Sequence, residues 1–139
     1  MDIEIANYRL FRKRYAAVKI GMFGKPGAQL FVRNRANDRR FSRVIPCRIE
    51  MANEYHPKWD LYVFREPCPF CGGVHTHGAS WGPRVAHCPI RDIADDVLGI
   101  ESHDYYVASE SEFLTIWRHA VDITRLQDPR VYDRVFGNA

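Results

Sequence analysis

Three of the four cysteines and three of the six histidines of this chain lie between residues 68 and 88. The stretch reads Cys-Pro-Phe-Cys-Gly-Gly-Val-His-Thr-His-Gly at residues 68–78 and ends in His-Cys at residues 87–88. Two thiolates spaced as C-x-x-C can bind one ion from a single tight turn, and imidazole is the other usual donor to structural zinc. The glycine pair lets backbone N–H groups turn toward the sulfurs, because glycine tolerates positive φ. We therefore expect Zn²⁺ in a closed Cys₃His site.

The order of the donors along the chain suggests how they meet. We expect residues 74–77 and 84–88 to form a β-hairpin around a turn at residues 78–83. Side chains alternate along a strand, so His75 and His77 share one face, and His75 lies nearer the cysteines. His75 is the preferred fourth ligand, followed by His77 and then His87. The candidate metal ligands are Cys68, Cys71, His75, His77 and Cys88.

Three other chemistries fit parts of this motif less well. A redox dithiol needs its first cysteine at a helix start, and the two glycines after Cys71 do not continue a helix. A disulfide framework suits secreted proteins, and the opening residues have no signal-peptide pattern. A catalytic zinc site of the nucleobase deaminase type needs an upstream H-x-E, but His56 is followed by Pro57 and Lys58. A zinc hydrolase stays an alternative only if the metal keeps an open coordination position.

The motif C-P-x-C-G-x-x-H-x-H-G, followed by G-x-R-V-A-H-C, resembles a segment of small uncharacterised proteins of actinobacteria and their phages. The resemblance covers residues 68–88 only, and Pro83 stands where those proteins often carry a histidine. It implies a zinc-binding protein of phage or actinobacterial type, and it implies no particular activity.

Charge is distributed unevenly along the chain. Residues 1–66 hold 14 Lys and Arg against 7 Asp and Glu, whereas residues 67–139 hold 6 against 10. Arginine dominates the segment between two expected strands, and guanidinium groups bind phosphates in a bidentate manner. We expect this arginine-rich loop to contact nucleic acid or a nucleoprotein assembly, through Arg33, Arg35, Arg39, Arg40 and Arg43. A solvated surface that pairs with the acidic half is the alternative, and an adaptor or inhibitor that binds a host or phage protein is another.

Hydrophobic periodicity predicts one α+β domain over residues 1–139. A basic part at 1–66 is expected to form a small antiparallel sheet, with strands at 28–33, 43–51 and 59–65 and with Pro46 marking an edge or a bulge. The run 7–20 is read as a short strand followed by a helix. The zinc-binding hairpin at 67–90 is expected to be zinc-ribbon-like or treble-clef-like.

The acidic part at 91–139 is expected to be helical. One helix should start at Pro89 and end at Gly99, and a capping box at Ser109 should open a longer one. Asp128-Pro129 should start a last short helix. No apolar run approaches the roughly twenty residues that span a membrane. The missing signal pattern and the reduced, zinc-competent cysteines lead us to expect a cytoplasmic protein. The sequence contains no Gly-rich phosphate loop, no H-E-x-x-H and no G-x-S-x-G.

Overall fold

The chain has an α+β fold built on a mixed sheet. The computed structural model describes residues 3–4, 7–10, 13–35, 40–86, 88 and 104–137. The first strands are β1 (Ile3–Glu4), β2 (Asn7–Leu10), β3 (Lys13–Ile20), β4 (Gln29–Asn34) and β5 (Ser42–Glu50). They are followed by β6 (Leu61–Phe64), β7 (Thr76–Gly78), β8 (Gly82–Val85) and β9 (Asp104–Ser109). The chain continues through α1 (Glu110–His119), β10 (Val121–Asp122), a 3-10 helix (Ile123–Gln127) and α2 (Pro129–Phe136).

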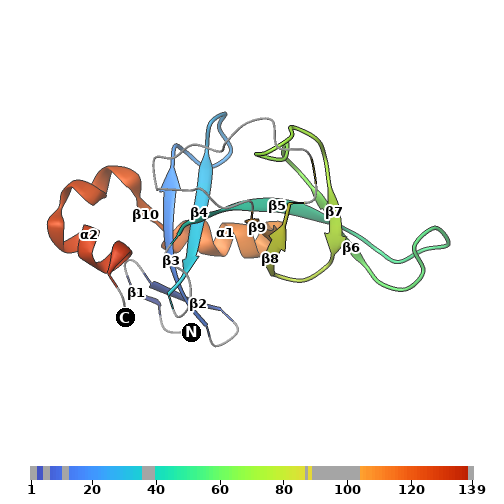
Figure 1. Cartoon of the computed structure of the whole chain (residues 1–139), viewed down its shortest axis with the longest axis horizontal. Coiled ribbons are helices and arrows are strands. Elements are labelled where there is room, and N and C mark those ends of the chain that lie inside the picture. The colour runs from blue at the N-terminus through green and yellow to red at the C-terminus, as the bar shows by residue number, and fades with distance from the viewer. Residues whose placement is uncertain are drawn as a thin grey trace.

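Strand β5 connects the two halves of the sheet. Strands β1 to β7 pair in chain order, and β9 lies parallel to β5 from Arg43 to Cys47. The other edge of β5 pairs with β4 at residues 42–43 and with β6 at residues 47–50. Figure 1 shows β5 running from the β3–β4 hairpin to the β6–β7 hairpin. The expected purely antiparallel sheet is therefore wrong, because β9 and β10 add parallel neighbours.

Pro46 does not mark an edge strand, although proline cannot donate to a ladder. Its carbonyl accepts a hydrogen bond from the Arg65 N–H at 2.9 Å, and a residue in a strand points both backbone groups to the same side. The nitrogen of Pro46 therefore points to the edge of β5 that faces β4 and β6. Between residues 43 and 47 neither of these strands pairs with β5, so no ladder hydrogen bond needs an N–H at this position. The strand keeps its partner β9 without losing a hydrogen bond.

The segment 13–20 is a strand and not the expected helix. Tyr15, Ala16, Ala17 and Val18 are all buried, because β3 has core on both faces. A strand buried on both faces lacks the alternation of apolar and polar residues that identifies a half-exposed strand. The helical spacing of Tyr8, Phe11, Tyr15 and Val18, from which the helix was predicted, was therefore misleading.

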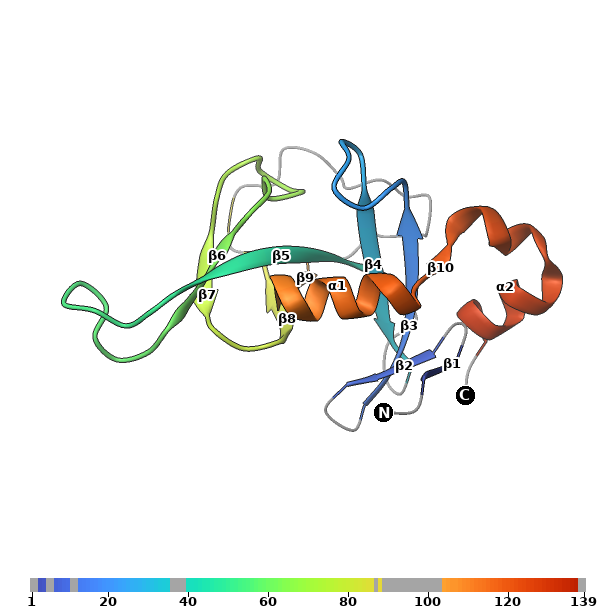
Figure 2. The ribbon, with the colours of Figure 1, turned by 180° about the vertical axis from the view of Figure 1, so that it is seen from behind.

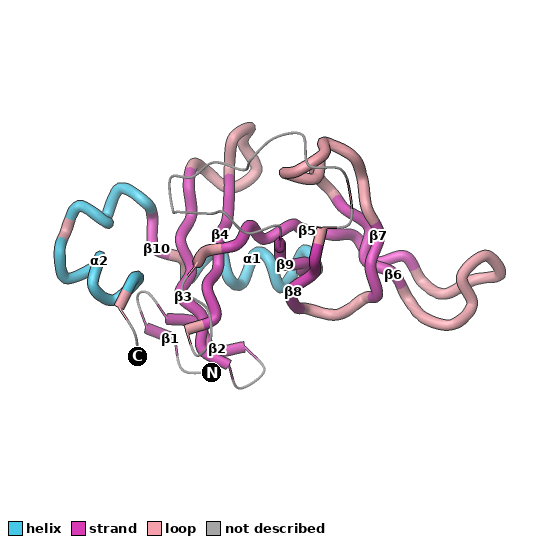
Figure 3. Tube along the Cα trace, in the orientation of Figure 1, coloured by secondary structure: helices cyan, strands magenta, loops and turns pink. Residues whose placement is uncertain are grey.

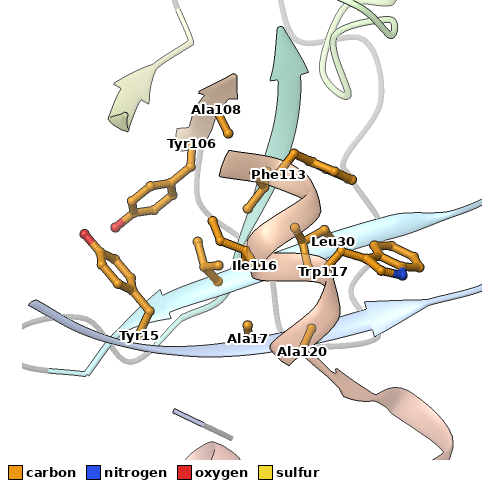
Figure 4. Packing of buried hydrophobic residues seen from close by; sticks show 11 residues of the cluster. Tyr15, Ala17, Leu30, Tyr106, Ala108, Phe113, Ile116, Trp117 and Ala120 are labelled. Carbon is orange, nitrogen blue, oxygen red and sulfur yellow. The ribbon is translucent and has the colours of Figure 1, made fainter. Parts of the chain in front are cut away.

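Helix α1 covers one face of the sheet, in front of β3, β4 and β5 in Figure 2. The predicted capping box is confirmed, since Ser109 Oγ accepts from the Glu112 N–H and the Ser109 N–H donates to Glu112 Oε1. Ile116 is fully buried against the strands, and Figure 4 shows it on the side of α1 that faces Tyr15. This cluster is the main core of the β3–β4 half. Its buried members are Tyr15, Ala17, Leu30, Val32, Val44, Tyr106, Ala108, Phe113, Ile116, Trp117 and Ala120.

Helix α2 covers another group of buried residues beside β3 and β4. Its predicted start is confirmed: Asp128 caps the helix by accepting from the Arg130 N–H, and Pro129 is the first helical residue. Val131 and Val135 pack on Phe31 and Phe41. Figure 3 shows the helices of the described chain only after β9, with strands before it.

The predicted hairpin between residues 74–77 and 84–88 does not form. Strand β7 pairs with β6, and β8 pairs with β9. The alternation of side chains that suggested two strands is compatible with any antiparallel neighbour, so the sequence did not identify the strands with which β7 and β8 pair. The hairpin that carries the cysteine motif is therefore β6–β7, with residues 65–75 as its loop. The helix expected at 89–99 lies outside the described residues.

Candidate metal centre

Cys68 and Cys71, the first two cysteines of the motif, lie in a compact turn at the end of the β6–β7 hairpin. The Gly72 N–H donates to the Cys68 carbonyl at 2.8 Å, and the Cys68 N–H donates to the Gly73 carbonyl at 2.8 Å. Gly72 has a φ of +76°, a conformation that other residues rarely adopt. The turn therefore requires glycine after the second cysteine, as the sequence predicted.

Backbone N–H groups of the same turn point at the sulfurs. The Phe70 N–H donates to Cys68 Sγ at 3.4 Å, and the Gly73 N–H donates to Cys71 Sγ at 3.3 Å. Hydrogen bonds of this kind stabilise thiolate over thiol, since they place partial positive charge beside the sulfur. The turn is thus arranged to bind through two thiolates.

Four side chains bring their donor atoms together at this turn. The sulfurs of Cys68, Cys71 and Cys88 and a ring nitrogen of His75 all lie within 4.8 Å of one another. Cys68 Sγ and Cys88 Sγ are 3.7 Å apart, and Cys71 Sγ is 3.1 Å from His75 Nε2. Two sulfurs on one tetrahedral zinc, each at about 2.3 Å, are separated by about 3.8 Å. The cluster therefore fits a metal ion in both spacing and donor type.

The electrostatics of the cluster also favour a cation. The N–H of Gly73 lowers the pKa of Cys71 to about 7, with further help from His75. Burial, together with the neighbouring sulfurs of Cys71 and Cys68, raises the pKa of Cys88 to about 12. Three sulfurs this close repel one another as thiolates unless a cation lies between them. A bound metal ion removes that repulsion, because thiolate is the form that binds metals.

His77 takes a different role from His75. Its Nε2 forms a hydrogen bond with the hydroxyl of Tyr105, and it is paired in register with Tyr62. His75 instead reaches the sulfurs, with its ring edge-on to Phe64 at 5.4 Å. Among the described residues, His75 is thus the histidine that joins the cluster, whereas His87 lies outside them.

The aromatic residues that support the two histidines were not identified from the sequence. Phe64 contacts both imidazole rings, and it also meets Tyr105 at 5.2 Å between ring centroids. Tyr105 comes from β9, 28 residues after His77 along the chain, and is 2% exposed. The period-two pattern at residues 61–64 was the available signal, but it predicted only which residues share a face.

Cys47 is separate from the cluster. Its side chain is fully buried, its thiol donates to the Ile45 carbonyl at 3.5 Å, and burial raises its pKa to about 12. A thiol with a raised pKa is a small apolar group rather than a ligand.

The predicted arginine surface is divided between the core and the exterior. Arg33 is 1% exposed, and its Nη2 donates to the carbonyls of Val135 at 3.1 Å and Gly137 at 2.8 Å. Arg35 Nη2 also donates to the Gly137 carbonyl, at 3.2 Å. The carbonyls at the carboxyl end of a helix have no donors within the helix, and the buried guanidinium of Arg33 supplies donors to them at the end of α2. The assignment of Arg33 to phosphate binding is therefore wrong.

The remaining arginines are placed differently. Arg43 forms an ion pair with Glu66 at 3.5 Å, and its side chain is 20% exposed. Arg40 is exposed, and Arg39 lies outside the described residues. The structure therefore does not gather the five arginines on one surface.

Comparison with known proteins gives no relative for this chain. No family model, no curated protein and no solved structure matches it significantly. In the described part of the chain, no helix combines the length and the apolar character needed to cross a membrane.

Proposed function

We propose that this chain is a non-enzymatic zinc-binding protein in which one Zn²⁺ is held by Cys68, Cys71, His75 and Cys88. The observation that carries the proposal is the convergence of these four donor atoms within 4.8 Å. Three thiolates and one imidazole are a donor set typical of structural zinc. The resemblance of residues 68–88 to small actinobacterial and phage proteins is compatible with this proposal.

The proposed ion would join parts of the chain that are distant in sequence. Cys68 and Cys71 belong to the β6–β7 hairpin, whereas Cys88 follows β8, which pairs with β9. Phe64, Phe70, Tyr105 and Val107 are already buried beside the cluster. Zinc would therefore fix this lobe rather than fold the entire chain, since α1 and α2 have apolar cores of their own.

Substitution of the ligands tests this proposal. Cys71→Ser should reduce the zinc content of the purified protein well below one ion per chain, measured by elemental analysis. Cys47→Ala is the matched control, because it removes a buried cysteine outside the cluster and should leave the zinc content unchanged. Equal zinc content in all three proteins would reject the proposed site.

A closed shell argues against the zinc hydrolase alternative. Four protein donors complete a tetrahedron, and catalytic zinc needs a position for water or substrate. We therefore place the function of the protein in binding rather than in catalysis.

A protein partner is favoured by the projecting end of the β5–β6 hairpin, residues 48–61, which we call the finger. Figure 1 shows it extending away from the rest of the molecule. Its exposed apolar side chains include Tyr55 at 87%, Met51 at 66% and Trp59 at 59%. Trp and Tyr are the residue types enriched among the energetic anchors of protein interfaces, and grouped exposure of this kind marks interaction sites.

Side-chain contacts hold the finger in one shape. Asp60 Oδ1 accepts from the Ala52 N–H at 2.8 Å, which closes the finger at its base. Asn53 Oδ1 accepts from the Tyr55 N–H at 2.8 Å, and His56 Nε2 lies 3.0 Å from Glu50 Oε1. A loop ordered before binding loses less conformational entropy on binding, which supports the role of an adaptor or inhibitor.

Nucleic-acid binding is the second candidate, and the exposed Arg40 is the observation that favours it. Association with DNA or RNA weakens steeply with salt, in proportion to the number of phosphates neutralised. If this candidate is correct, Arg40→Ala should reduce both the affinity for a labelled oligonucleotide and the slope of its salt dependence, measured by fluorescence anisotropy.

One experiment separates the two candidates. The immobilised protein is incubated with actinobacterial extract, with and without nuclease treatment, and this source is chosen for the resemblance of residues 68–88. Adaptor function predicts a partner that is lost with Trp59→Ser but retained with Arg40→Ala and with Tyr132→Ser, an exposed aromatic outside the finger. Capture that disappears after nuclease treatment or with Arg40→Ala would instead favour nucleic acid.

A further inference from the structure

A cavity of about 500 Å³ lies between the β3–β4 turn, β5 and the start of α1. Phe23 and Ala28 line it from the turn, Pro46 from β5, and Phe113 and Leu114 from α1. The volume is in the range of pockets that bind small molecules, and such pockets are usually apolar with a few polar groups. Neither the zinc cluster nor the finger contributes a lining residue, so the cavity is independent of the function proposed above.

Two aromatic residues, Phe23 and Phe113, line this cavity. Trp117 is not a lining residue but supports them: its ring is stacked on that of Phe113 with centroids 6.1 Å apart, and Figure 4 shows both on the same side of α1. Phe23 meets them from the turn, at 6.3 Å from Phe113 and 5.8 Å from Trp117. Phe23 remains 52% exposed, so part of an aromatic face is available to a ligand. A flat apolar group fits beside such rings, because offset and edge-on contacts between aromatic groups are favourable.

Most charges at the rim of the cavity are already compensated. Arg65 Nε lies 2.9 Å from Glu110 Oε1, and Glu66 Oε1 lies 3.5 Å from Arg43 Nη2. Lys25 also lines the cavity, and no ion pair involves its side chain among the described residues. Arg43, which pairs with Glu66, is not itself a lining residue, so Lys25 is the lining charge that these two ion pairs leave uncompensated.

The backbone of the turn holds Lys25 at the rim. The Lys25 N–H donates to the Met22 carbonyl at 3.0 Å, and the Ala28 N–H donates to the Lys25 carbonyl at 3.2 Å. Gly24 and Gly27 on either side have positive φ values, which fix the course of the turn. Lys25 thus lines the cavity from an ordered turn that also carries Phe23.

We propose that this cavity binds a small amphipathic anion, with an aromatic or branched apolar body against Phe23, Phe113 and Leu114 and a carboxylate or similar group facing Lys25. The apolar wall provides most of the affinity, since burial of apolar surface is its main source. The lysine selects the sign of the ligand charge, because complementary charge contributes more to specificity than to affinity.

The probe for this proposal is anilinonaphthalenesulfonate, an aromatic anion whose emission increases in apolar surroundings. The full chain should bind it saturably, with one site per chain, in a fluorescence titration. Leu114→Trp should abolish that site by filling the cavity. Lys25→Gln should weaken binding about two- to fivefold, the range expected for one partly exposed charge contact.

Matched controls separate the cavity from other apolar surfaces. Lys58→Gln removes a lysine from the finger and Trp59→Ser removes its exposed indole, and both should leave the titration unchanged. Phenylnaphthylamine has the same ring system without the sulfonate, so its binding should be weaker and insensitive to Lys25→Gln. Circular dichroism and zinc content of each variant verify that the fold is kept.

Three results would overturn the proposal. One is a titration that does not saturate at one site per chain. The second is probe binding that survives Leu114→Trp or falls with Trp59→Ser. The third is an equal effect of Lys25→Gln and Lys58→Gln, which would show that the lysine of the turn has no role.

Discussion

Replacement of Arg33 by methionine tests whether this residue anchors α2 or serves an external ligand. The substitution keeps most of the side-chain volume and removes the guanidinium of a residue that is 1% exposed. Arg33 Nη2 donates to the Val135 and Gly137 carbonyls at 3.1 and 2.8 Å. Gly137 keeps Arg35 as a donor, so the Val135 carbonyl loses its charged partner. One charged hydrogen bond lost and one weakened amount to roughly 2–4 kcal/mol in the free energy of unfolding.

The assay for this prediction is urea unfolding followed by far-ultraviolet circular dichroism, with zinc in excess. Arg40→Met is the matched control, because Arg40 is exposed and surface substitutions change stability by about 0.5 kcal/mol or less. The reasoning would be refuted if Arg33→Met lost no more stability than Arg40→Met.

Three further perturbations have expected outcomes. Ile116→Ala removes a fully buried side chain and should lower the free energy of unfolding by about 2–5 kcal/mol in the same urea assay. Ser109→Ala removes the α1 cap and should cost about 1 kcal/mol, whereas Ser111→Ala, two residues further on, should have little effect. In the finger, the hydrogen bond with Glu50 raises the pKa of His56, and His56 lowers the pKa of Glu50. The contribution of protonated His56 to this contact is complete below the ordinary histidine pKa of 6.5 and is lost as pH rises through the raised pKa. The contribution of ionised Glu50 is lost as pH falls through its lowered pKa. The contact is therefore strongest between about pH 4.5 and 6.5, and an NMR titration of His56 whose pKa is unchanged by Glu50→Gln would contradict this.

Local signals predicted the elements whose causes are local. The capping box at Ser109 and the Asp128-Pro129 helix start each involve residues within one turn, and both elements lie where the sequence placed them. The same is true of the cysteine turn, because the C-x-x-C spacing and Gly72 determine its backbone directly.

Long-range features could not be predicted in this way. The burial of Arg33 depends on carbonyls 102 and 104 residues further along the chain. The parallel pairing of β9 with β5 likewise joins segments whose patterns fit other partners equally well. Strand β3 was misread because both of its faces are buried, which removes the alternation that distinguishes a strand from a helix.

X-ray absorption at the zinc edge of the purified protein tests the central claim most directly. We expect one zinc per chain with three sulfur neighbours at about 2.3 Å and one nitrogen neighbour at about 2.0 Å. His75→Ala should remove the nitrogen neighbour or the zinc itself. His77→Ala should leave the spectrum unchanged, because the native His77 ring contacts Tyr105. Absence of zinc, a shell without three sulfurs, or a nitrogen neighbour lost with His77→Ala and kept with His75→Ala would contradict the proposed site.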